Sequence, residues 1–170
     1  MRGETLGIGF AFTNDEPELT EHLDFGRHPC FVSTRFESVE LEMPAGHYRR
    51  WFSPNNYLSG ETEEIEFEGG AMPFERAKLP GSYILELVDV PKRNFVFHDQ
   101  PSGREVVIDL GDAPYLTLWS DGSAFLCVEP CWGLTDRHEQ RAFEAKEGIQ
   151  TIPAGGRLKT SFTIAPALRR

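Results

Sequence analysis

Residues 115–132, YLTLWSDGSAFLCVEPCW, contain two short apolar runs separated by a polar turn. The runs Tyr115–Trp119 and Phe125–Val128 carry aromatic and β-branched residues, which favour strands. Between them, Ser120–Ser123 contains Asp and Gly, which are typical of tight turns. This stretch therefore predicts a β-hairpin.

The same pattern extends outward along the chain, where helical periodicity is scarce. Short apolar runs are separated by Gly, Pro, Asn and Asp. The other predicted strands are Gly7–Thr13, Phe36–Met43, Glu64–Phe67, Ser82–Val88, Asn94–Phe97, Glu105–Leu110 and Lys159–Ile164. About nine strands without a helical layer predict an all-β fold, a β-sandwich. Helical turns are expected at most in Thr135–Lys146, whose polar sequence fits an ordered loop equally well.

A chain of 170 residues suits one core, so we expect a single β-sandwich domain over residues 1–170. The formal net charge of −10 disfavours binding to nucleic acid or to an anionic membrane. No apolar run approaches the ~18 residues that cross a bilayer, and no secretory signal is evident. We expect a cytoplasmic protein.

Part of the negative charge is local, because five glutamates stand close together in the sequence. They are Glu61, Glu63, Glu64, Glu66 and Glu68. The favoured interpretation is a solvated strand face and loop. An acidic patch for a metal or a protein partner is the alternative.

The chain has three cysteines, Cys30, Cys127 and Cys131, and no pair has CxxC spacing. Their odd number and the lack of a secretory signal favour reduced thiols. We interpret Cys127 and Cys131 as small core residues. A metal site built from His22, His28 and Cys30 is the weakest alternative, because the spacing supplies no carboxylate ligand.

One carboxylate, Glu129, interrupts the apolar run that ends the hairpin. A proline cannot continue a central ladder, so Pro130 predicts that the chain leaves the sheet there and that Glu129 lies at the lip of the sandwich. Apolar neighbours would exclude water and raise the pKa of the carboxyl group toward neutral pH, which suits a general base. The alternative is a structural carboxylate paired with an Arg or Lys.

A second unusual stretch is DFGRHPCF, residues 24–31. Pro29 pushes His28 toward an extended conformation, and an imidazole can donate a proton near neutral pH. His28 is therefore a candidate general acid, and a structural histidine is the alternative. We expect the Glu129 carboxylate and the His28 ring to converge on one open face, where a gap near ~5–8 Å would let one pyranose bridge them by ordinary hydrogen bonds.

Three stretches resemble the aldose 1-epimerase (galactose mutarotase) superfamily, in the same order along the chain. GRHPCF at residues 26–31 resembles the family's G-x-H-P-x-F motif, and FLCVEPCWGLTD at residues 125–136 resembles its glutamate-bearing strand. KEGIQ and PAGG, within residues 146–156, resemble its ending. The resemblance runs from Leu6 to Ile164 and corresponds to the C-terminal portion of longer family members.

The resemblance implies part of a galactose mutarotase-like supersandwich, with a sugar site on a concave sheet face. It implies that Glu129 is the general base and His28 the general acid of ring opening and closure, with no metal and no redox cofactor. The family's substrate-binding aspartate matches the position of Asn94, with Asp89 or Asp99 as nearby substitutes.

The substrate implied by the resemblance is a small-molecule sugar or sugar phosphate, which Arg27 and Trp132 are expected to contact. Trp132 or Trp51 offers a flat face that can stack on a sugar ring. A phosphate could meet several arginines, which are otherwise ordinary surface charges. These arginines are Arg27, Arg35, Arg49 and Arg50.

Two further functions stay open. A non-catalytic carbohydrate-binding sandwich would use the same face without chemistry. A ligand-free interaction domain would use an exposed sheet to join a partner. Because the family's other half has no counterpart in this sequence, sheet edges would be uncovered, and exposed edges invite pairing. We therefore also expect a homodimer formed through the exposed sheet.

Overall fold

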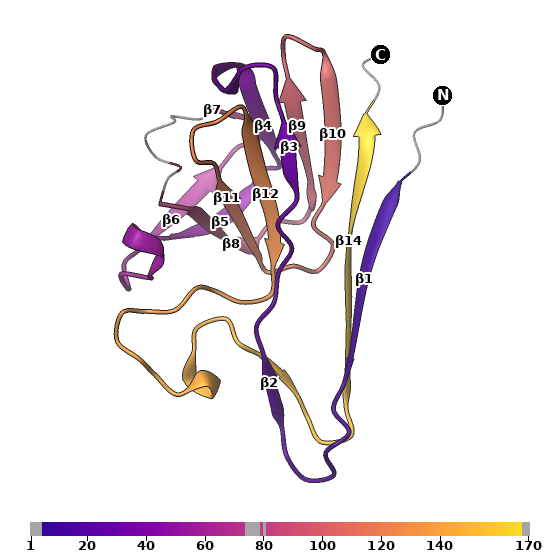
Figure 1. The fold of residues 1–170 in the computed structure, drawn as a ribbon, viewed down its shortest axis with the longest axis vertical. Helices are drawn as coiled ribbons and strands as arrows, with labels where there is room; N and C mark the ends of the chain where they lie inside the picture. The colour runs from indigo at the N-terminus through magenta and orange to yellow at the C-terminus, as the bar shows by residue number, and fades with distance from the viewer. Residues whose placement is uncertain (1–4, 74–78, 80, 168–170) are drawn as a thin grey trace.

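The computed structural model describes residues 5–73, 79 and 81–167, and the regular structure of these residues is almost entirely β (Figure 1). The strands are β1 (Leu6–Thr13), β2 (Glu21–Leu23), β3 (Cys30–Val32), β4 (Val39–Met43), β5 (Gly46–Trp51), β6 (Thr62–Phe67), β7 (Gly70–Pro73), β8 (Tyr83–Asp89), β9 (Asn94–Asp99), β10 (Arg104–Asp109), β11 (Tyr115–Trp119), β12 (Phe125–Cys131), β13 (Gln150–Ile152) and β14 (Arg157–Ala167). Short 3-10 helices are η1 (Phe36–Ser38), η2 (Pro54–Asn56) and η4 (Phe143–Ala145).

The described strands form two six-stranded sheets and one two-stranded sheet. The first sheet has the order β1-β14-β10-β9-β4-β7, and the second has the order β3-β12-β11-β8-β5-β6. The small sheet pairs β13 with β2, which lie at the lower end of the molecule in Figure 1. All these strand pairs are antiparallel. The prediction of an all-β sandwich is confirmed.

The core lies between the two large sheets, and the predicted hairpin β11–β12 supplies its centre. Leu118 pairs with Val128, and Thr117 pairs with Glu129. Because side chains alternate between the two faces of a strand, Leu116, Leu118 and Val128 point into the core and are fully buried. Thr117 and Glu129 point to the opposite face. The first sheet contributes the buried side chains Leu41, Phe95, Phe97 and Ile108.

β12 continues through Pro130 to Cys131, so the prediction that the chain leaves the sheet before Pro130 is wrong. The N–H group of Val128 donates to the Pro29 carbonyl group at 3.1 Å. Backbone groups two residues apart point to the same side of a strand, so the Pro130 nitrogen faces the segment before β3. The regular ladder between β12 and β3 ends at Cys127 and Cys30, so no ladder hydrogen bond is needed from the Pro130 nitrogen. The Pro130 carbonyl group accepts a hydrogen bond from the Arg27 N–H group at 3.0 Å.

Other segments also depart from their predicted structure. Phe36–Met43 begins with η1, so the strand starts only at Val39, although Phe36 itself is buried in the core. The segment Thr135–Lys146 is a loop with one turn of 3-10 helix, η4. Strands β2, β3, β5, β7 and β13 were not predicted; most have three or four residues, too few to show a period of two.

The expectation that all three cysteines are reduced is wrong for two of them. The structure joins Cys30 and Cys127 in a disulfide, while Cys131 is a free thiol. The antiparallel register of β3 and β12 places Cys30 directly opposite Cys127. Their separation of 97 residues gave no indication of this pairing, because only the strand register brings them together.

The first sheet ends at β1 and the second ends at β3, and both edge strands expose large apolar side chains. Leu6 in β1 is 60 % exposed and Val32 in β3 is 66 % exposed. Such edges fit the expected homodimer, which stays a prediction. Within the described part of the chain, no helix has the length and apolar character needed to cross a membrane.

The carboxylate of Asp99, at the end of β9, provides a test of the fold. Asp99 is fully buried, and desolvation opposes its charge. Hydrogen bonds from Ser102, Arg104 and Thr34 outweigh desolvation and lower its pKa to about 2. Its folded pKa lies below the unfolded value of about 3.9, so its contribution to stability is present above about pH 4 and is lost as the pH falls toward 2.

We predict that Asp99→Asn lowers the free energy of unfolding by roughly 2 kcal/mol at pH 7. Urea unfolding of both proteins at several pH values would measure the difference, which should shrink between pH 4 and pH 2. A difference that stays constant over this range would contradict the proposed role of the charge.

Candidate functional site

The candidate site lies on the face of the second sheet that points away from the core. Alternation along β12 puts Cys127, Glu129 and Cys131 on this face. Across the sheet, Thr117 of β11 lies opposite Glu129, and Ile84 of β8 lies opposite Thr117. A row of side chains therefore crosses the sheet, with Glu129 near the β3 edge.

A cavity of about 420 Å³ opens on this face. Its walls come from the sheet, from the segment before β3 and from the loop after β12. The polar side chains that line it are Asp24, Ser53, Asn56, Ser82, Thr117, Glu129, Thr135, Asp136 and Lys146. The volume is in the range of small-molecule sites, and the lining suits a small ligand with several hydrogen-bonding groups.

The loop of residues 133–149 follows β12 (Figure 1). Its residues 133–136 and 146 line the cavity. Its Leu134 packs with Ile84 and Tyr115 in a buried cluster apart from the main core. Near its end, Gly148 has a φ of +74° and lies so close to the Tyr115 ring that a Cβ atom would meet the ring at 2.9 Å. Burial of apolar side chains, together with a glycine that permits close approach, thus fixes the loop over the sheet.

Glu129 is a buried carboxylate, with 8 % of its surface exposed. Desolvation disfavours the charged form and raises the pKa of Glu129 to about 7. Its Oε1 atom makes no hydrogen bond. Among the described residues, no Arg or Lys lies within ion-pair distance, so the alternative of a carboxylate neutralised by such a partner has no support.

His28 lies beside Glu129 because the segment before β3 follows β12. The hydrogen bond from Val128 to the Pro29 carbonyl group holds the backbone next to His28. The His28 Nε2 atom lies 3.1 Å from Glu129 Oε1, and 57 % of the His28 side chain is exposed. The ring meets the Trp119 ring edge-on, with centroids 5.8 Å apart.

The two proton-handling groups therefore share one face, but they lie closer together than the ~5–8 Å at which a pyranose would bridge them by ordinary hydrogen bonds. They are in direct contact at an ion-pair distance. The cause is the extended backbone of the segment before β3, which follows β12 closely and leaves His28 and Glu129 as neighbours. Neither side chain is sealed from the cavity side of the sheet, since Glu129 lines the cavity and His28 is mostly exposed.

A charged group at the cavity wall was missed by the sequence analysis. Lys146 Nζ pairs with the Asp24 carboxylate and lies 3.0 Å from Asp136 Oδ1. In the sequence, Asp24 and Lys146 stand out only as the first residues of the stretches DFGRHPCF and KEGIQ. Their place beside two motif-like stretches was the one indication of a role, but nothing in the sequence indicates that the two stretches lie close together in the fold.

Three predicted binding residues do not line the cavity. Trp132 is 2 % exposed and stacks on Phe25 in the core, with ring centroids 5.0 Å apart, so it cannot stack on a sugar. The Arg27 guanidinium lies 4.9 Å from the centroid of the Phe10 ring. Asn94 is exposed at the start of β9, in the first sheet rather than the second.

The two substitutes for Asn94, Asp89 and Asp99, do not line the cavity either. Asp99 is fully buried and fully engaged by Ser102, Arg104 and Thr34, so it cannot contact a ligand. Asp89 is exposed at the end of β8 and does not line the cavity. Asn94 and Asp99 belong to β9, which lies in the other sheet, whereas Asp89 lies in the same sheet as Glu129 but at the end of β8, outside the cavity lining.

The far end of the same face is a network of charges around Trp51. The Trp51 indole donates to Glu86 at 3.0 Å, and Arg49 donates to Glu86 at 3.2 Å and to Glu64 at 2.6 Å. Glu64 belongs to the acidic run on β6, most of which is exposed. The run is therefore a solvated strand face, as favoured above. None of the four arginines considered as phosphate ligands lines the cavity.

No protein-family model matches the chain. Protein LacX of Lactococcus lactis subsp. lactis, in its plasmid and chromosomal forms, is 27 % identical over 179 aligned positions. The match covers 96 % of this chain and 58 % of LacX. The chain thus spans less than two thirds of the length of the curated relatives it matches.

Solved structures with a similar fold include a galactose mutarotase related enzyme from Lactobacillus acidophilus, with a TM-score of 0.82 and 18 % identity, covering 96 % of this chain and 58 % of that one. A galactose mutarotase-like protein from Lactobacillus casei ATCC 334 gives a TM-score of 0.81 at 24 % identity, with coverages of 95 % and 58 %. A similar protein from Clostridium acetobutylicum gives 0.68 at 16 %, with coverages of 96 % and 52 %. The chain has the galactose mutarotase-like fold that the sequence resemblance implied.

The buried carboxylate should cost stability as it ionises. Because the folded pKa of Glu129 is about 7 and the ordinary value is 4.5, the folded protein binds this proton more tightly than the unfolded chain. The stability that the proton contributes is fully present below about pH 4.5 and is lost as the pH rises through about 7.

We predict that Glu129→Gln is more stable than the wild type by roughly 1–3 kcal/mol at pH 8, and equally stable near pH 4. Denaturant unfolding at both pH values would measure this, with Glu66→Gln as the control because the Glu66 side chain is 82 % exposed. Equal stability of Glu129→Gln and wild type at pH 8 would contradict the desolvation of Glu129.

Proposed function

We propose that this chain carries the acid–base centre of an aldose 1-epimerase, which interconverts the two anomers of a sugar. One observation carries the proposal: a desolvated carboxylate with a pKa near 7 touches an imidazole beside a cavity of small-molecule size. Proteins named as galactose mutarotase-like have the same fold. The fold supports the class of reaction, and the site supplies the chemistry.

In the proposed reaction, ionised Glu129 takes the proton of the anomeric hydroxyl group while protonated His28 gives its Nε2 proton to the ring oxygen. The bond between the anomeric carbon and the ring oxygen breaks, and the anomeric C=O bond forms. Rotation of the aldehyde presents its other face. On ring closure, protonated Glu129 gives its proton to the aldehyde oxygen while neutral His28 takes the proton from the hydroxyl group that becomes the ring oxygen, so that both residues end as they began. Each transfer contributes roughly 10²–10⁴-fold to the rate.

The closeness of His28 and Glu129 suits this chemistry once the His28 ring turns aside to admit the sugar. The hydroxyl oxygen and the ring oxygen are bonded to the same anomeric carbon, so the acid and the base must lie close together. A pKa of about 7 keeps a large fraction of Glu129 ionised at neutral pH while leaving it basic enough to accept a proton. Most of the His28 side chain is exposed, which gives its ring room to turn as a sugar enters.

The cavity lining favours a neutral sugar over a sugar phosphate. Lys146 is the cation among the described residues that line the cavity, and it is already paired with Asp24 and Asp136. A phosphate there would meet three carboxylates, including Glu129, against one lysine. The same carboxylates and the Thr117 hydroxyl group are suitable partners for sugar hydroxyl groups.

We predict that Glu129→Gln and His28→Asn each lower the catalysed rate of anomer interconversion by roughly 10²–10⁴-fold. Polarimetry of freshly dissolved α-D-galactose and α-D-glucose would measure the rate. In the wild type, kcat/KM should fall as the pH drops below about 7, because Glu129 then becomes protonated and can no longer act as the base.

The matched controls are Glu66→Gln and His22→Asn, which change the same residue types away from the cavity and should keep the wild-type rate. Retention of the full catalysed rate in both Glu129→Gln and His28→Asn would refute the mechanism. Wild-type rates in both control variants, together with strongly lowered rates in the two site variants, would support the mechanism.

A second candidate function, carbohydrate binding without catalysis, is favoured by one observation. The direct contact between His28 and Glu129 leaves no gap for a pyranose to bridge them. Calorimetric titration with the same two sugars separates the candidates. Binding without any rate enhancement by the wild-type protein would favour this second function over the first.

A further inference from the structure

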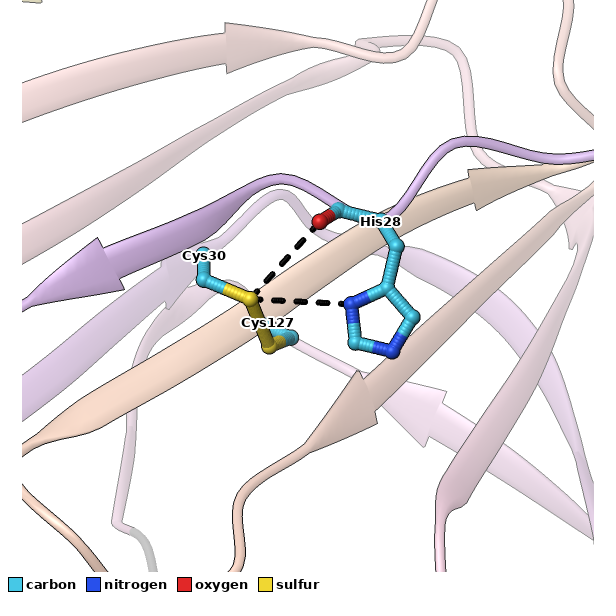
Figure 2. A group of neighbouring side chains, drawn as sticks. All are labelled: His28, Cys30 and Cys127. Atoms are coloured by element: carbon cyan, nitrogen blue, oxygen red, sulfur yellow. Dashed lines mark hydrogen bonds between the residues drawn. A yellow bond between two sulfur atoms is a disulfide. The ribbon is translucent and has the colours of Figure 1, made fainter.

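Three side chains of metal-ligating type converge at the β3 edge of the candidate site. They are His28, Cys30 and Cys127, and their donor atoms all lie within 4.8 Å of one another (Figure 2). His28 and Cys30 are alternate residues of one extended segment and so share a face. Cys127 lies directly across from Cys30 in the neighbouring strand β12.

We propose that this cluster is a redox-gated Zn²⁺ site. A thiol reductant converts the Cys30–Cys127 disulfide to two thiols and is itself oxidised to a disulfide. Each cysteine thiol then loses one proton, and the two thiolates bind the metal together with a neutral His28. The site differs from the metal alternative considered from sequence, because His22 lies in β2 of the small sheet and Cys127 provides the third ligand.

The ligand set and its spacing suit zinc. Two thiolates and one imidazole form a known type of zinc site that leaves a fourth position open, and soft thiolates select zinc over magnesium or calcium. In Figure 2 a ring nitrogen of His28, Nδ1, faces Cys30 Sγ, and the two atoms are 3.6 Å apart. Sulfur and nitrogen ligands of one tetrahedral zinc ion lie about 3.5 Å apart, given the usual bond lengths.

The other ring nitrogen of His28 lies next to a carboxylate, the kind of group that orients a metal-bound histidine. Nε2 lies 3.1 Å from Glu129 Oε1, and a metal-bound histidine usually donates its second N–H group to a carboxylate. Cys127 is fully buried and would form the floor of the site. Cys30 and His28 are exposed, so a metal ion can reach them from solvent. Metal binding at this cluster does not depend on the proposed sugar chemistry.

The test uses the full chain, reduced with a phosphine under anaerobic conditions and titrated with Co²⁺ as a spectroscopic substitute for Zn²⁺. We expect one equivalent of Co²⁺ to give a thiolate-to-metal charge-transfer band and the visible bands of four-coordinate cobalt, and added Zn²⁺ to abolish both. The oxidised protein should show neither. The absence of the charge-transfer band in the reduced wild type would overturn the proposal.

Single-residue variants would identify the side chains that bind the metal ion. Cys30→Ser, Cys127→Ser and His28→Ala should each weaken Co²⁺ binding by at least about tenfold, whereas the matched controls Cys131→Ser and His22→Ala should keep the wild-type spectrum. Cys30 is exposed at a sheet edge, so its variant is expected to fold, and circular dichroism would verify this. Unchanged cobalt binding by folded Cys30→Ser would refute the site.

Discussion

The antiparallel register between β12 and the segment that leads into β3 is the constraint on which the rest of the site depends. Backbone hydrogen bonds from Trp132 to Phe25, from Arg27 to Pro130 and from Val128 to Pro29 set this register. It brings His28 to Glu129 and Cys30 to Cys127. Because side chains alternate along a strand, a slip by one residue would turn them to opposite faces.

Desolvation of Glu129 connects the stability of the fold with the proposed chemistry. The same burial that raises its pKa to about 7 makes its charged form unfavourable in the folded protein. The loop of residues 133–149 lines the same cavity as Glu129, and the cluster around Leu134 packs it against the sheet. Burial of Glu129 therefore lowers the stability of the fold at neutral pH, and the same burial provides a base that functions at that pH.

The sequence predicted those features that depend on local patterns. The hairpin Tyr115–Trp119 and Phe125–Val128 was predicted because its alternation and turn residues are local, and the burial of Glu129 followed from its apolar neighbours. The amino-acid sequence alone could not predict the disulfide, the contact between His28 and Glu129, or the pairing of Lys146 with Asp24, because these contacts depend on how distant segments pair in the fold. Trp132 was misplaced because an aromatic residue beside a site motif can equally belong to the core, where it packs on Phe25.

The central claim is that Glu129 is a desolvated carboxylate that titrates near neutral pH while in contact with His28. The most direct test is a ¹³C NMR titration of the glutamate side-chain carboxyl groups, with the Glu129 signal assigned by its absence in Glu129→Gln. The structure predicts a midpoint near pH 7 for this one group. A midpoint near the ordinary value of 4.5 would show that the carboxylate is solvated and would contradict the account.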